Sequence, residues 1–173
     1  MNTQYQEKLL RADEIYQLRC RTLETKHPNK IAAIEITSES VFVGDGVAEA
    51  LQQALNAGVE DPLFVKRIGS LDKFVVFQSV LTQQRLQAFW RDFAPAYTTQ
   101  PPSKTSPFPG LMQKLGHDRL AIVLFSTEDG ARTFLTKVGD PHQTVMEASL
   151  PDLQDFIHAQ GARRQNLVVE MLP

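Results

Sequence analysis

The chain has 173 residues, of which 42% are hydrophobic and 22% charged, a balance typical of one soluble globular domain or two small ones. Its 18 basic and 20 acidic residues leave no basic excess, which argues against nucleic-acid binding. The N-terminus is polar, and no window approaches the roughly 18 apolar residues of a membrane span. We therefore expect a cytoplasmic protein that binds neither nucleic acid nor membrane.

The first predicted element is a helix over residues 4–26, where apolar residues recur at steps of three and four. His27-Pro28 ends it, because the residue before a proline resists the helical conformation. The apolar stripe either docks on the sheet of its own domain or faces a partner subunit. The second alternative predicts a homodimer through this helix. Cys20, the single cysteine, lies on the helix and is expected to be a small buried apolar residue.

Residues 29–69 predict two short strands at 30–36 and 41–43, joined as a hairpin, then a helix over 47–56 and a strand over 63–68. Asp45 is the expected N-cap of that helix. Gly58 occupies the position favoured for a left-handed helix end.

A further strand is predicted over 73–80 and a helix from Thr82 to Phe93. The aromatic residues on one face of this helix, Phe89 and Trp90 among them, favour core packing over a ligand-stacking site. Residues 95–118 then hold half of the 10 prolines. A connection of this length predicts an irregular functional loop or linker.

The last third predicts a buried strand over 120–125, a helix capped by Ser126, a strand over 144–148, a second helix after Ser149 and a closing strand over 167–171. The helices are expected to end at Gly139 and Gly161.

Together these elements predict a mixed α+β fold in three parts, which we expect to pack as one compact unit. Residues 1–94 hold the N-terminal helix and a ββαββα lobe, 95–118 form the proline-rich connection, and 119–173 form a βαβαβ lobe. Residues 41–68 and 122–149 both run strand, capped helix, Gly, Asp-Pro, strand. This echo reflects either convergence on one turn or an old duplication.

The strand starting Asn29-Lys30-Ile31, the strand Val41 to Gly44 and the strand starting Pro62-Leu63 resemble the pattern of the DUF5678-like family of uncharacterised prokaryotic domains. The resemblance implies a scaffold and brings no functional residues. The segment 120–173 is similar to the βαβαβ piece of SseB-type proteins, through IVLFSTEDGARTFL and the terminal LVVEMLP. That likeness implies fold only.

The sequence holds few groups with catalytic spacing. No nucleophile motif, phosphate-binding loop or metal-ligand pair occurs, so we expect no cofactor and no metal. His117 and Asp118, adjacent at the end of the proline-rich segment, are the candidate catalytic or binding pair, since imidazole and carboxylate together can tune a proton transfer. Phe108 between two prolines is a candidate binding residue that either pins the loop or projects toward a partner.

Two functional hypotheses follow. The first is a non-enzymatic binding or adaptor module that acts through protein–protein contacts, dimeric through the first helix or a free strand edge. The alternative is a small-molecule-binding enzyme or sensor with its site under residues 95–118. A deep pocket favours the alternative, and a flat apolar groove or a two-fold interface favours the first.

Overall fold

The computed structural model describes residues 3–79, 83–100, 111–116, 119–138, 143–160 and 167–173. The helices are α1 (Thr3–Lys26), α2 (Val47–Asn56), α3 (Gln83–Phe93), α4 (Glu128–Val138) and α5 (Leu150–Ala159). The strands are β1 (Ile31–Glu35), β2 (Ser40–Gly44), β3 (Leu63–Arg67), β4 (Val75–Ser79), β5 (Tyr97–Gln100), β6 (Leu111–Gly116), β7 (Arg119–Phe125), β8 (Thr144–Glu147) and β9 (Leu167–Leu172). The predicted α+β class is confirmed.

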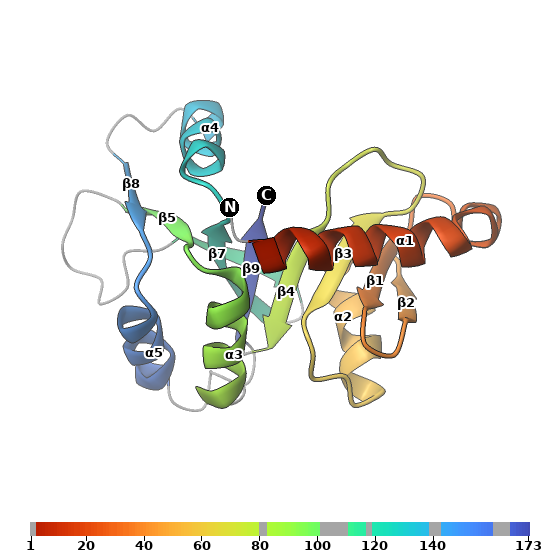
Figure 1. Ribbon diagram of the computed structural model, residues 1–173, viewed down its shortest axis with the longest axis horizontal. Coiled ribbons are helices and arrows are strands. Elements are labelled where there is room, and N and C mark those ends of the chain that lie inside the picture. The colour runs from red at the N-terminus through yellow and green to blue at the C-terminus, as the bar shows by residue number, and fades with distance from the viewer. Residues whose placement is uncertain (1–2, 80–82, 101–110, 117–118, 139–142, 161–166) are drawn as a thin grey trace.

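The described strands form one sheet in the order β2-β1-β3-β4-β9-β7-β5-β8, with β6 beside β7. Neighbours are antiparallel except β7 and β9, which run parallel. The pairing of β4 with β9 joins strands from the two predicted lobes into this one sheet. Helices α1, α3 and α5 bury their apolar faces in one core layer, and α1 and α3 lie in front of the strands in Figure 1. Helices α2 and α4 pack on the opposite face.

The predicted echo corresponds to a repeated topology. In the first half, β1 lies between β2 and β3 and is antiparallel to both, and α2 connects the two outer strands. In the second half, β5 lies between β7 and β8 and is antiparallel to both, and α4 makes the connection. The likeness of the two segments therefore extends beyond their turns to the arrangement of three strands and a helix.

Helix α1 docks on the sheet, as the first of the two alternatives for its apolar stripe predicted. Tyr5, Ile15 and Tyr16 are buried in the core layer that α3 and α5 also fill. The Tyr16 hydroxyl accepts a hydrogen bond from the Gly69 backbone N–H at 2.9 Å. This bond ties the middle of the helix to the turn after β3, where Gly69 has a positive φ of 79°.

We expect Tyr16→Phe to lower the free energy of unfolding by about 0.5–1.5 kcal/mol, the net contribution of one hydrogen bond, because the Gly69 N–H loses its acceptor. Urea unfolding measures the change. Tyr97→Phe on β5, at the other end of the sheet, is the matched control and is expected to stay near the wild-type value. Equal stabilities for the two variants would show that the Tyr16 bond does not hold α1 in place.

The hairpin and the helix after it follow the prediction, but Asp45 is not the cap. The residue in the N-cap position of α2 is Gly46, which is extended. The Asp45 carboxylate instead pairs with Lys30 Nζ at 2.8 Å, and its backbone N–H donates to Glu49 Oε2 at 2.7 Å. Gly58 has a positive φ of 78°, as its position after the helix predicted.

The segment 95–118 contains two strands, which corrects the prediction of an irregular connection. Strand β5 pairs with β8 over four residues, and β6 pairs with β7. The reason is non-local, since β5 finds its partner more than 40 residues further along the chain. Buried Thr98 and Thr99 show that even its polar residues lie inside the molecule.

The remaining elements of the last third agree with the sequence. At α4, however, the side chain that caps the helix belongs to Thr127, whose Oγ1 accepts the Gly130 N–H at 3.0 Å, and not to the predicted Ser126, which is buried. Ser149 is the N-cap residue of α5, as predicted, although its side chain makes no capping bond. Thr82, Gly139 and Gly161 lie outside the described residues.

Candidate functional site

The residues that the sequence proposed for chemistry, Phe108, His117 and Asp118, lie outside the described residues and stay predictions. Cys20 is half-buried against the core, and its Sγ donates to the Gln17 carbonyl oxygen at 3.2 Å. Within the described part of the chain, no group of three or more His, Cys, Asp or Glu side chains could hold a metal ion.

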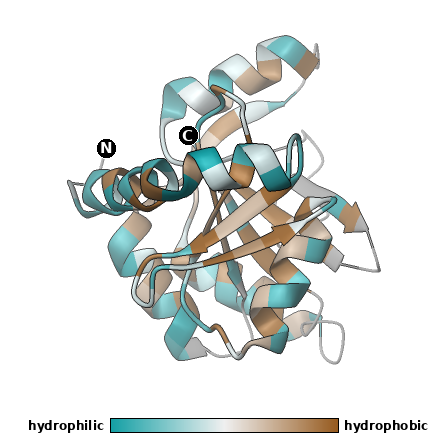
Figure 2. Cartoon of the chain, turned by 90° about the vertical axis from the view of Figure 1, so that its right-hand side faces the viewer, coloured by the Kyte–Doolittle hydropathy of each residue, from teal (hydrophilic) through white to brown (hydrophobic). Residues whose placement is uncertain are grey.

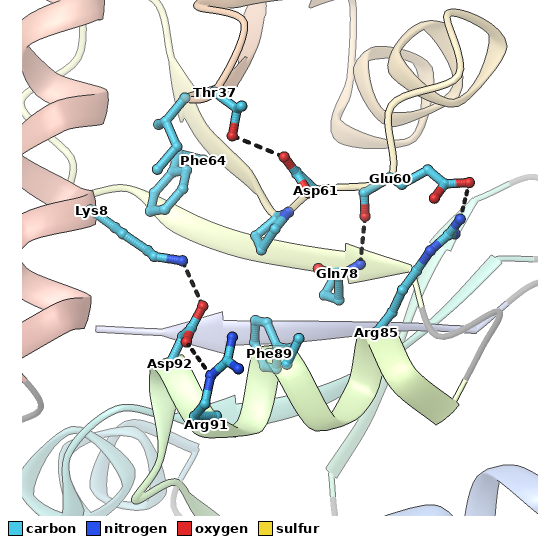
Figure 3. A pocket seen from close by; sticks show the side chains of 13 residues that line it. Lys8, Thr37, Glu60, Asp61, Phe64, Gln78, Arg85, Phe89, Arg91 and Asp92 are labelled. Carbon is cyan, nitrogen blue, oxygen red and sulfur yellow. Dashed lines mark hydrogen bonds and ion pairs between the residues drawn. The ribbon is translucent and has the colours of Figure 1, made fainter.

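A polar cleft of about 280 Å³ lies between α1, α3, the β1–β2 turn and the start of β3 (Figure 3). Lys8 Nζ pairs with Asp92 Oδ2 at 2.7 Å, and Arg91 Nε donates to Asp92 Oδ1 at 3.2 Å. Arg85 pairs with Glu60 across the cleft. Each of these charges pairs with an opposite charge of the same chain, so ion pairs join α1 to α3 and α3 to the connection before β3.

The neutral polar side chains of the cleft also have hydrogen-bond partners within the chain. Thr37 Oγ1 donates to Asp61 Oδ2 at 2.9 Å, and Gln78 Nε2 donates to the Glu60 carbonyl oxygen at 3.0 Å. Burial raises the pKa of Asp92, but hydrogen bonds and charge from Lys8 and Arg91 outweigh that effect and hold the pKa below its usual value. A ligand in this cleft would have to displace internal partners.

A second pocket, of about 290 Å³, opens on the opposite face of the sheet beside the start of α2. We call it the Glu170 pocket. It is lined by Ile31, Val47, Val65, Lys66, Arg67, Asp72, Lys73, Val75, Phe77 and Glu170. The lining combines an apolar middle with charged residues at its ends.

Side chains along a strand point alternately to the two faces of the sheet, which explains how β3 and β4 build this pocket. On β4 and the residues before it, Lys73, Val75 and Phe77 share one face. Val65 on β3 lies opposite Val75 in the register of the two strands. Arg67 comes two residues after Val65 and Lys73 two residues before Val75, and both line the same pocket. The pocket therefore has the exposed Arg67, Lys73 and Asp72 at one end and Phe77 toward the other.

Glu170 forms the inner end of the pocket. It lies on β9 between Phe77 of β4 and Val123 of β7, and its side chain is only 6% exposed. Its Oε2 is buried and has no hydrogen-bond partner among the described residues. Burial among apolar neighbours raises the pKa of Glu170 to about 7.

The charged residues that share the pocket with Glu170 are held at its outer end. Arg67 Nη1 donates to the Asn29 carbonyl oxygen at 2.8 Å, and Asp72 Oδ2 accepts from Ser70 Oγ at 2.8 Å. Lys66 points to the other face of the sheet, where its Nζ lies 4.6 Å from the centroid of the Tyr16 ring of α1. The charges of these residues do not shift the pKa of Glu170, which is raised by burial alone.

This site escapes prediction from the sequence, because Glu170 stands in the run LVVEML, where it looks like the solvated residue of a strand. The missing information is that β9 lies in the centre of the sheet, where both faces are buried. A single glutamate in an otherwise apolar strand is the only local signal, and it marks a position to examine.

Comparisons with models of protein families, with curated proteins and with solved structures found no match. The resemblances to DUF5678-like and SseB-type proteins therefore stay predictions. Among the described helices, none combines the length and the apolar character needed to cross a membrane.

Proposed function

We propose that this protein binds a small molecule in the Glu170 pocket. The observation that carries the proposal is the Glu170 carboxyl group, which is buried at the inner end of an open pocket with an oxygen that no described residue satisfies. Ligand sites commonly combine an apolar lining with a few polar groups that fix orientation, and titratable groups with a perturbed pKa gather there.

The unmet hydrogen bond of Glu170 Oε2 makes ligand binding energetically favourable. A buried acceptor without a donor costs roughly 1–3 kcal/mol, and more when it is charged. A ligand whose donor reaches this oxygen recovers the cost on binding, whereas a ligand in the polar cleft first breaks existing ion pairs. The Glu170 pocket is therefore the better supported of the two sites.

The test is a nuclear magnetic resonance screen of a panel of benzene-derived fragments at millimolar concentration. We expect shift changes at Val65, Val75 and Val47, whose methyl groups line the pocket, and none at Ala88 in the polar cleft, the matched control. Shift changes confined to the polar cleft, or none at any fragment, would overturn the proposal.

A second candidate function, protein binding, is favoured by the edge strand β2. Its residues Ser40–Gly44 include no charge and no proline, and its outer edge pairs with no other described strand. The opposite edge strand β8 carries the exposed charge of Glu147. Unprotected edges accept strands from other chains, so β2 is the natural place for a partner strand. Figure 2 views the molecule from the side on which β2 lies.

Self-association through β2 is tested by light scattering over a range of protein concentrations. We expect a dimer that Val43→Lys dissociates, because the added charge blocks the half-buried edge, while Val145→Lys on β8 leaves the dimer intact. Circular dichroism confirms that both variants fold. A wild-type protein that stays monomeric throughout excludes pairing between two copies at β2.

A further inference from the structure

We infer that the ligand of the Glu170 pocket is an organic acid whose acidic group lies between Arg67 and Lys73, whose apolar body fills the middle, and whose far end donates a hydrogen bond to Glu170. The inference rests on the proposed function and names the class of molecule for that same site.

The outer end of the pocket favours an anion. Arg67 and Lys73 are both exposed pocket residues, and together with Asp72 they leave a net positive charge at this end. Two cations at the same end of a pocket repel each other. An acidic group between the two side chains would relieve that repulsion and form charge-assisted hydrogen bonds with both.

The middle of the pocket favours an apolar ring or chain. Ile31, Val47, Val65, Val75 and Phe77 supply its walls and offer no side-chain polar atoms. The pocket volume of about 290 Å³ compares with roughly 150 Å³ for an apolar cavity that holds benzene. A substituted aromatic ring is therefore of a suitable size.

The distance between the two ends sets the length of the ligand. Lys73 precedes Phe77 by four residues, which is roughly 13 Å along an extended chain, and Phe77 lies opposite Glu170. The Lys73 and Glu170 side chains shorten the remaining gap. A benzene ring with an acetate arm on one side and a hydroxyl group on the other has the required order of groups.

The experiment measures dissociation constants of three probes at mildly alkaline pH, where Glu170 is ionised. Para-hydroxyphenylacetate carries both polar ends, phenylacetate lacks the donor, and para-cresol lacks the acid. We expect para-hydroxyphenylacetate to bind at least about tenfold more tightly than either, since a hydrogen bond to a charged group contributes about 1.5–3 kcal/mol.

Two variants test which pocket residue binds each end of the ligand. Glu170→Met is expected to abolish the advantage of para-hydroxyphenylacetate over phenylacetate, and Lys73→Met to reduce its advantage over para-cresol. Asp61→Asn, in the polar cleft, is the control and should retain both preferences. Unfolding curves for each variant confirm that the fold is intact.

The outcomes separate this inference from the proposed function. If fragments bind in the pocket but the three probes bind equally, or if Glu170→Met keeps the preference for the hydroxyl group, the ligand class is wrong and the pocket remains a binding site. If neither the probes nor the fragment panel bind in the pocket, both proposals fail together.

Discussion

Glu170→Gln is expected to gain stability relative to wild type as the pH rises. Between about pH 4 and about pH 8, its free energy of unfolding should increase relative to that of wild type by on the order of 3 kcal/mol. The cause is the buried carboxyl group, whose pKa is raised from 4.5 to about 7 by burial. A tenfold change in proton affinity corresponds to about 1.4 kcal/mol.

The sign follows from proton binding. In the unfolded chain Glu170 loses its proton near 4.5, whereas in the folded protein it keeps the proton up to about 7. Between these values the folded state binds more protons than the unfolded state, so wild-type stability falls as pH rises, and above about 7 the loss is complete. The glutamine side chain of the variant does not titrate, so the variant does not lose this stability as the pH rises.

Urea unfolding of both proteins across this pH range measures the effect. Glu147→Gln, which removes an exposed carboxylate from edge strand β8, is the matched control and should parallel wild type. A difference between Glu170→Gln and wild type that stays constant with pH would mean that the carboxyl group is not desolvated as the structure describes.

Gly44→Ala is expected to destabilise the protein by about 1–3 kcal/mol, the usual range for overpacking in a well-packed region. A Cβ atom at Gly44 would lie 2.5 Å from the Ala50 backbone nitrogen and 2.9 Å from Glu49 Cβ. Neither neighbour is the free end of a flexible side chain. The start of α2 would have to move away from the end of β2.

Gly46→Ser is the matched control, two residues away and with a larger side chain. No atom lies within 4 Å of a Cβ built at Gly46, and serine is favoured at an N-cap position. Thermal unfolding should therefore show a clear loss for Gly44→Ala and no loss for Gly46→Ser. Equal behaviour of the two variants would contradict the close approach of α2 to β2.

Most of the regular elements could be predicted because their signals are local. The apolar stripe of α1 and the proline after it define that helix within one residue at its start. The helix 47–56 is recovered with the same bounds as α2, since Gly46 and Gly58 flank it. The caps were harder to predict. At Asp45 and Ser126 a neighbouring residue takes the capping position, and cap choice depends on backbone angles that composition does not reveal.

The features that escaped prediction depend on contacts between distant parts of the chain. Strand β5 is polar and stands among prolines, so only its pairing with β8 reveals it. The Glu170 pocket combines β3, β4 and β9, whose meeting is decided by sheet order rather than by any local pattern. The candidate pair His117 and Asp118 is predicted from adjacency alone, and adjacency does not determine what a side chain faces.

A carbon-13 titration of the Glu170 carboxyl group tests whether this residue is the polar end of a ligand pocket. We expect a midpoint near pH 7 in the free protein, and a lower one when the tightest-binding fragment is present, because a donated hydrogen bond favours the carboxylate. A midpoint near the ordinary 4.5 in the free protein, or one that saturating fragment leaves unchanged, would contradict this expectation.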